Sequence, residues 1–247
     1  MGDVSVRFLG SGDAFGSGGR FQTCIYVRFD TTHFLVDCGA SSLIAMRHFG
    51  VEPSLIDAIL LTHLHGDHFG GLPFFVLDAQ FVSRRKKPLV VAGPPGLEDR
   101  INEAMEVLYP GSSQQQRDFA LKFVELEEEA ATRIEPLTVT PHGVVHPSGA
   151  PSYALRVVCG EKILAYSGDT EWTDTLIQVA HSADLFICEC NFLEKSVGYH
   201  LDYRTLMDHR TELKCRRLVV THMNDEMLRR IQSLDVEGAE DGKSLAL

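Results

Sequence analysis

The sequence predicts an α/β protein in which two buried sheets are covered by outer helices. Short apolar or alternating segments recur along the 247 residues, as strands require, and between them lie segments in which apolar residues have helical spacing. Strands dominate the first half of the chain, whereas strands and helices alternate toward its end. Periodicity alone leaves other α/β layouts open. The expected strands cover residues 4–9, 24–29, 34–37, 58–61, 89–92, 121–124, 137–140, 153–158, 163–166, 185–188 and 218–221, and the expected helices cover residues 41–49, 97–108, 173–180, 203–213 and 225–234.

Residues 1–247 are expected to form one domain, because nothing in the sequence marks a linker. Hydrophobic residues make up 44% of the chain and charged residues 23%, which is ordinary for a globular protein with its own core. Segment 237–247 contains Gly and Glu residues and is expected to be a loosely ordered tail.

A cytoplasmic protein that is not bound to a membrane is expected. The N-terminal residues lack the basic start and apolar core of a signal peptide, and no apolar run approaches the ~20 residues that span a bilayer. The six cysteines form no CxxC pair and fit reduced core residues. The net charge of −11 argues against non-specific binding of nucleic acid, which depends on positive charge, but leaves a small anion open as a ligand.

Residues 63–68 contain three histidines and one aspartate, directly after the apolar run 58–61. Neutral imidazoles and carboxylates are the usual ligands of zinc-like ions, and burying four such groups unpaired would be costly. The apolar run is typical of a buried strand that delivers ligands at its C-terminal end. His63 and His65 would project from the same side of an extended chain, and Asp67 and His68 would follow in the turn, facing a second ion.

Three further ligand candidates, His146, Asp169 and His222, each lie just past a predicted strand. The ends of strands are the usual place for functional groups in layered α/β proteins. Asp169 could bridge two ions with its two carboxylate oxygens, which an imidazole cannot do. The sequence therefore predicts one metal centre built from segments far apart in the chain.

This set of residues resembles the metallo-β-lactamase superfamily. The cluster His63-x-His65-x-Asp67-His68 is similar to the superfamily signature, and residues 34–39 are similar to its early strand and turn, which carries a supporting aspartate. The resemblance extends to about residue 224 and implies a four-layer αββα sandwich. It also implies two divalent metal ions, zinc in the first place and manganese or iron as alternatives. One ion would be held by His63, His65 and His146 and the other by Asp67, His68 and His222, with Asp169 between them.

Within the superfamily, the sequence most resembles ribonuclease Z and related phosphodiesterases. The glycine-rich residues 8–12, the turn 93–97 and the segment 166–170 are similar to that group in order and spacing. Glu189 followed by His200 is similar to the glutamate and later histidine that those enzymes use around the scissile phosphate. The flexible arm that grips tRNA in bacterial ribonuclease Z has no counterpart here, because only 23 positions separate the third and fourth metal motifs. The sequence therefore leaves RNA open as a partner and makes tRNA doubtful.

These observations predict a dinuclear metal-dependent hydrolase, above all a phosphodiesterase in which a metal-bridging hydroxide attacks phosphorus. Asp67 would orient or deprotonate the water, and His200 would protonate or stabilise the leaving oxygen. Glu189 would fix the tautomer of His200 or of the last metal histidine. The expected substrate is a small-molecule or nucleotide-type phosphoester, and the resemblance implies a homodimer.

Two other functions stay open. One is hydrolysis of a lactone, a thioester or another carbonyl ester on the same fold, to which the pair Glu189 and His200 is less suited. The other is a binding or regulatory module without catalysis, which the complete ligand set disfavours. A basic run at residues 84–87 is either an anion-steering patch near the pocket or a solvated loop that caps a helix. Arg20 is a candidate contact for a substrate phosphate.

Overall fold

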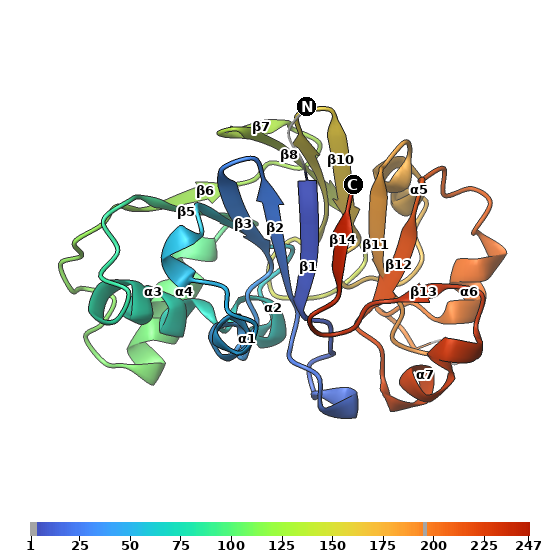
Figure 1. The fold of residues 1–247 in the computed structure, drawn as a ribbon, viewed down its shortest axis with the longest axis horizontal. Coiled ribbons are helices and arrows are strands. Elements are labelled where there is room, and N and C mark those ends of the chain that lie inside the picture. Colours follow the sequence, from blue (N-terminus) through green and yellow to red (C-terminus); the bar gives the residue numbers. More distant parts are fainter. Residues whose placement is uncertain (1–3, 195–196) are drawn as a thin grey trace.

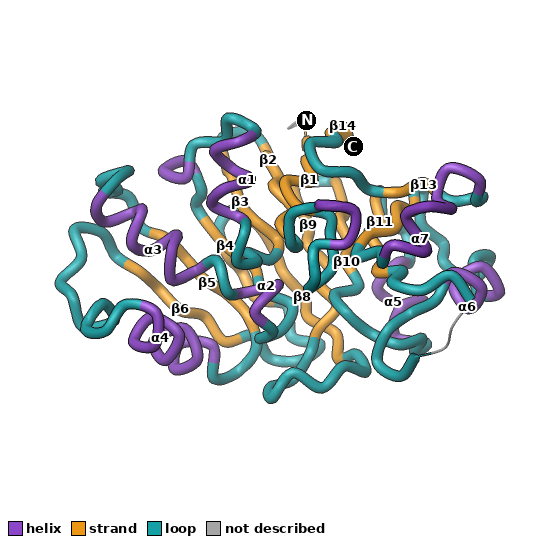
Figure 2. The backbone as a smooth tube through the Cα atoms, turned by 90° about the horizontal axis from the view of Figure 1, so that it is seen from below, coloured by secondary structure: helices purple, strands orange, loops and turns teal. Residues whose placement is uncertain are grey.

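The computed structural model describes residues 4–194 and 197–247, and within these residues two seven-stranded sheets pack face to face (Figure 1). The view from below shows helices on the outer side of each sheet (Figure 2). The arrangement has the four layers αββα that the sequence analysis implied. Each of the eleven expected strands overlaps an observed strand.

The first sheet begins with antiparallel strands and continues as a parallel sheet. Its strands are β1 (Val4–Gly10), β2 (Cys24–Phe29), β3 (Thr32–Val36), β4 (Ala58–Leu60), β5 (Leu89–Gly93), β6 (Leu121–Glu125) and β14 (Ser244–Ala246). Their order is β14-β1-β2-β3-β4-β5-β6, and the pairs from β3 to β6 are parallel.

The second sheet repeats this plan. Its strands are β7 (Thr132–Ile134), β8 (Leu137–Gly143), β9 (Tyr153–Cys159), β10 (Lys162–Tyr166), β11 (Leu185–Glu189), β12 (Leu218–Thr221) and β13 (Glu237–Gly238). Their order is β13-β12-β11-β10-β9-β8-β7, and the pairs from β10 to β13 are parallel. Between the third and fourth metal motifs the chain forms only the hairpin of β9 and β10, without an inserted arm.

The helices divide between the two outer faces. The first sheet is covered by α1 (Ser42–His48), α3 (Leu72–Phe81) and α4 (Leu97–Leu108), and the second by α5 (Thr175–Ala180), α6 (Tyr203–Asp208) and α7 (Asp225–Arg230). The short helix α2 (Gly66–Phe69) follows β4, and three 3₁₀ helices are η1 (Ser17–Gly19), η2 (Pro53–Leu55) and η3 (Ile231–Ser233). None of the described helices is long and apolar enough to cross a membrane.

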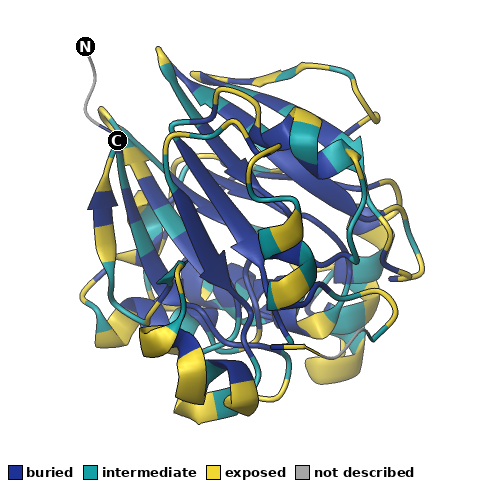
Figure 3. Ribbon diagram, turned by 90° about the vertical axis from the view of Figure 1, so that its right-hand side faces the viewer, coloured by how far each residue is buried: buried dark blue, intermediate teal, exposed yellow. Residues whose placement is uncertain are grey.

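Alternation along each strand separates three clusters of apolar residues. On β3, for example, Phe34 and Val36 pack between the two sheets, whereas Leu35 packs under the outer helices. The central strands are therefore buried on both faces, and exposed residues gather on helices, loops and edge strands (Figure 3). A doubly covered sheet of this kind holds the ends of its parallel strands in fixed positions.

Segment 237–247 differs from the loosely ordered tail that the sequence predicts. Residues Glu237–Gly238 pair with β12, and residues Ser244–Ala246 pair with β1, so the segment closes one edge of each sheet. Ala239 and Leu245 enter the core between the sheets. The segment is ordered because it pairs with β12, 18 positions earlier, and with β1, more than 200 positions earlier, and its own composition reveals neither contact.

Some helices also differ from the sequence-based expectation. The sequence does not predict α3, because apolar residues lie on nearly all sides of this helix and hide its periodicity. The helix expected over 203–213 ends at Asp208, and the one expected over 225–234 continues as η3 after Arg230.

Candidate metal centre

The seven predicted metal ligands meet at one end of the two sheets. His63 and His65 follow β4, and Asp67 and His68 lie in the short helix α2 where the sequence predicts a turn. The remaining ligands follow β8, β10 and β12 as predicted, and they are His146, Asp169 and His222. Parallel strands that end at the same edge bring these segments together.

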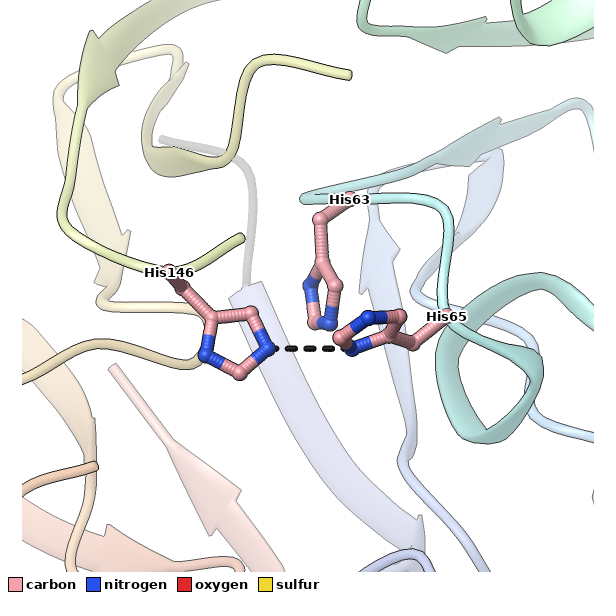
Figure 4. A group of neighbouring side chains, drawn as sticks. All are labelled: His63, His65 and His146. Atoms are coloured by element: carbon pink, nitrogen blue, oxygen red, sulfur yellow. Dashed lines mark hydrogen bonds between the residues drawn. The ribbon is translucent and has the colours of Figure 1, made fainter. Parts of the chain in front are cut away.

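One group of possible ligands consists of His63, His65 and His146, whose three rings converge (Figure 4). One nitrogen of each ring lies within 4.8 Å of the others. His146 Nε2 lies 3.0 Å from His65 Nδ1. Three imidazole nitrogens turned toward a common point are the arrangement expected of a metal site.

The second group adds carboxylates. Asp67 Oδ2 lies 3.2 Å from the Nε2 atoms of both His68 and His222. Asp169 Oδ2 lies 3.3 Å from His68 Nε2 and 3.4 Å from His222 Nε2. The same oxygen is 3.9 Å from His63 Nε2, so Asp169 stands between the two groups.

The donor atoms fit a divalent metal ion. His63 Nε2, His68 Nε2 and Asp169 Oδ1 are buried and have no hydrogen-bond partner among the described residues. Buried polar atoms are normally paired, and a divalent cation held by these side chains would give the three atoms a partner. Burial lowers the pKa of His63 and of His146, which favours the neutral imidazole that binds metals.

The charges around His222 also fit a bound cation. Burial alone would lower the pKa of His222, but Asp169 and the hydrogen bond with Asp67 outweigh burial and raise this pKa to about 9. The pocket of carboxylates therefore stabilises a positive charge at this point, and a divalent ion would supply it.

Two hydrogen bonds orient the metal histidines. Asp37 is fully buried and accepts from His68 Nδ1 at 2.7 Å and from the backbone N–H of Thr62 at 2.8 Å. His146 Nδ1 donates to the carbonyl of Tyr199 at 2.9 Å. In both rings the bond at Nδ1 leaves Nε2 turned toward the ligand groups, as in many metal sites.

Position 39 lies so close to the backbone of α2 that it requires glycine. A Cβ atom at Gly39 would lie 2.2 Å from the carbonyl oxygen of Asp67. Only glycine allows this close approach, which seats the start of α2 against the turn after β3.

Glu189 and His200, the two predicted catalytic partners, also meet at the site. Glu189 ends β11 with no exposed surface, and both of its oxygens lie within 3.3 Å of His200 Nδ1. The carboxylate also accepts from the backbone N–H of Thr170 at 2.5 Å and of Leu201 at 3.3 Å. The His200 ring lies 5.0 Å from the ring of His146, and these two side chains also form a third possible ligand group with Asp169.

Burial alone would lower the pKa of His200, but the hydrogen bond and charge of Glu189 outweigh burial and raise this pKa above its ordinary value. Within the protein's own charges, His200 is therefore held closer to its protonated form.

A cavity of about 650 Å³ opens above these residues. Sequence reasoning missed its walls, because the wall residues sit on loops and on α7 without a recognisable spacing. The cavity is lined by Asp13, Ala14, Phe15, Ser17, His65, Asp67, His146, Asp169, Asn191, Phe192, His200, His222, Asn224, Asp225, Glu226 and Arg229.

Arg20 and most of the basic run 84–87 make contacts within the fold. Arg20 is not among the lining residues and donates to Ser11 Oγ and to the carbonyl of Ala239. In the basic run 84–87, Arg85 is buried and its guanidinium donates to four backbone carbonyls. The two lysines of that run form ion pairs with Asp57 and Asp118, so three of the four cations in the run are paired within the fold.

Comparison with known proteins identifies the family. Residues 4–238 match the sequence profile of the family described as anti-Pycsar protein Apyc1. The chain belongs to the Apyc1 family. It is 26% identical over 278 residues to the ribonuclease Z of Limosilactobacillus fermentum, an alignment that covers 90% of this chain and 88% of the relative.

Several solved structures have the same fold as this Apyc1 family member. Human tRNase Z, short form (ELAC1), has a TM-score of 0.79 and 25% identity over 98% of both chains. The metallo-β-lactamase fold protein YhfI from Bacillus subtilis has a TM-score of 0.79 and 22% identity, covering 99% of this chain and all of the other. The chain is therefore a metal-dependent hydrolase of the metallo-β-lactamase fold and is related to ribonuclease Z.

Proposed function

We propose that this protein hydrolyses phosphodiesters with two divalent metal ions, zinc in the first place. The observation that carries the proposal is the pair of buried Glu189 and half-buried His200 beside two ligand groups that meet at Asp169. A carbonyl hydrolase would need the same metal ligands, but it would depend less on an imidazole that is oriented to protonate the leaving oxygen.

The chain offers one set of ligands to each ion. His63, His65 and His146 would hold the first ion, and Asp67, His68 and His222 the second, with Asp169 between them. When bound, two neighbouring divalent ions act as Lewis acids toward the phosphoester and lower the pKa of water toward neutrality.

We assign Asp67 to the attacking water, which it would orient. Its Oδ2 faces His68 and His222, and the residue also lines the cavity. Its second oxygen is then available to accept a hydrogen bond from water and to take up the proton that water loses. We therefore assign Asp67 both a ligand role and a base role.

We assign His200 to the leaving group. In the reaction a P–O bond to the water oxygen forms and the ester P–O bond breaks, so the departing oxygen needs a proton. Glu189 holds Nδ1 of His200, which leaves Nε2 to donate that proton from the cavity wall. Glu189 acts through His200 and is a positioning residue.

The cavity and the charge favour a compact substrate. A volume of about 650 Å³ suits a small molecule or a nucleotide-type phosphoester. The net charge of −11 disfavours binding of a polyanion such as tRNA. The short hairpin between β9 and β10 also leaves no inserted arm that could grip tRNA.

The test is hydrolysis of methyl p-nitrophenyl phosphate by protein loaded with zinc or manganese, beside metal-stripped protein and Asp67→Ala. We expect turnover that requires both metal and Asp67. No turnover in protein shown to hold two ions, together with hydrolysis of a lactone or thioester, would replace the proposal with the carbonyl alternative.

A second measurement tests the assignment of His200. His200→Ala should slow a diester with an alkyl leaving group by about 10²-fold or more, and p-nitrophenolate much less, because the better leaving group needs less protonation. Metal content should stay the same. His209→Ala is the matched control, since His209 stacks on Trp172 and does not line the cavity. Equal slowing of both leaving groups would refute a proton-donor role.

A further inference from the structure

Phe15 stands almost fully in solvent at the mouth of the cavity. Phe15 is one of the residues that line the cavity, although it is 94% exposed. An exposed phenylalanine leaves a large apolar surface in water and loses the free energy that burial of this surface would provide. Its position beside the metal ligands therefore indicates a ligand group that covers the ring.

The loop that carries Phe15 is held firmly. Asp13 is buried, with 3% exposure, and its carboxylate accepts from the backbone N–H groups of Phe15 at 3.1 Å and Ser17 at 2.9 Å, and from Ser17 Oγ at 2.7 Å. The N–H of Gly18 donates to Asp225 Oδ1 at 2.9 Å, which ties the loop to the start of α7. The ring is thus presented by an anchored backbone, so little ordering is lost when a ligand covers it.

The two aromatic residues of the cavity lie in different surroundings. The ring of Phe192 lies 6.4 Å from the ring of His200, which we assign to the leaving group. Phe15 comes from the connection between β1 and β2 and has no aromatic partner among the described residues. We therefore assign the wall at Phe192 to the leaving group, which leaves Phe15 for the ester group that stays on phosphorus.

We propose that Phe15 is a specificity-determining residue that stacks on a flat aromatic group in the retained ester of the substrate. The proposal rests on the proposed phosphodiesterase function. Aromatic rings attract one another in offset or edge-to-face arrangements, whereas a small alkyl group gains little from the same surface. The enzyme should therefore prefer aryl or heteroaryl phosphodiesters over alkyl phosphodiesters.

The experiment compares phenyl p-nitrophenyl phosphate with methyl p-nitrophenyl phosphate on the metal-loaded full chain. Both release p-nitrophenolate and differ only in the retained group. Phe15→Ala should lower kcat/KM for the phenyl diester by about threefold to tenfold, mainly through KM, and that for the methyl diester less than about twofold. Phe15→Trp should keep the preference.

A product-like inhibitor gives a second readout that is independent of the leaving group. Phe15→Ala should raise the inhibition constant of phenyl phosphate and leave that of methyl phosphate unchanged. Val107→Ala is the matched control, because Val107 is 81% exposed on α4 and lies outside the cavity lining. Both variants should keep the wild-type melting temperature, since neither side chain is buried.

The outcomes separate the two proposals. If wild-type protein hydrolyses neither diester, the proposed function fails. If it hydrolyses both and Phe15→Ala leaves the ratio of their kcat/KM values unchanged, the inference about Phe15 alone is overturned. Equal losses on both diesters, with a change in molecular mass by analytical ultracentrifugation, would place Phe15 in an interface between copies of the chain and would also overturn it.

Discussion

Asp241 joins the C-terminal segment to the connection between β1 and β2. Its Oδ1 accepts from the backbone N–H and from Oγ of Ser11, both at 2.8 Å, and its Oδ2 accepts from the backbone N–H of Phe21 at 2.8 Å. Ser11 and Phe21 bracket the loop that carries Phe15. Asp241→Ala removes all three bonds and leaves the fully buried Ser11 with an unpaired N–H group.

The expected loss follows from these contacts. A hydrogen bond to a charged acceptor contributes about 1.5–3 kcal/mol, and a buried donor left without a partner costs about 1–3 kcal/mol. Asp241 is only partly buried and one of its oxygens serves two donors, so the three bonds do not add fully. We expect Asp241→Ala to lower the free energy of unfolding by about 2–4 kcal/mol.

Equilibrium unfolding in urea on metal-loaded protein measures this loss, and hydrogen exchange locates it. The backbone amides of Ser11 and Phe21 should exchange faster in the variant. Glu240→Ala is the matched control, because Glu240 is exposed and adjacent in sequence, and it should change the free energy of unfolding by less than about 0.5 kcal/mol. Equal, small losses in both variants would refute the view that the C-terminal segment anchors the loop.

Three further measurements test other parts of the structure. Arg217, and with it Lys243, lowers the pKa of Glu237 from 4.5 to about 2, so the carboxylate contributes fully above pH 4.5 and loses its effect as the pH falls toward 2. The difference in unfolding free energy between wild type and Glu237→Gln should shrink over that interval, and a difference independent of pH would contradict the ion pair. The Tyr166 hydroxyl is buried without a hydrogen-bond partner among the described residues, so Tyr166→Phe should leave the free energy of unfolding unchanged or raise it by up to ~1 kcal/mol. A loss of more than ~1 kcal/mol in urea would show that the hydroxyl is paired. A chelator should abolish hydrolysis and lower the melting temperature, and zinc should restore both, because an ion that binds only the folded protein stabilises it; an unchanged melting temperature would count against the metal centre.

The meeting of the candidate metal ligands at one place could be predicted from the sequence because their segments follow apolar strands. His63, Asp169 and His222 come after β4, β10 and β12, which are strands of parallel pairs. Such strands end at the same edge of their sheets, so their following residues must lie near one another. Local spacing and the rules of strand pairing are enough to place these side chains together.

The edges of the sheets depend on contacts that no local pattern contains. Composition predicts a loose tail at Glu237 and Gly238, but the pairing with β12 and the ion pair with Arg217 order them. The same holds for α3, whose apolar residues lie on nearly all sides and give no helical stripe. In both cases tertiary packing decides the structure.

Arg20 shows why the cavity walls, unlike its floor, escape prediction. Its neighbouring glycines and its charge suggest a contact with substrate, but its guanidinium reaches the carbonyl of Ala239, more than 200 positions later in the chain. That contact turns Arg20 away from the cavity and fixes one end of the loop, while Asp13 fixes the turn that presents Phe15. The exposed position of Phe15 at the cavity therefore depends on two contacts, one made by Asp13 and one made by Arg20 with a residue distant in sequence. The mouth of the cavity is shaped where such distant segments meet, so it could not be predicted from local sequence patterns.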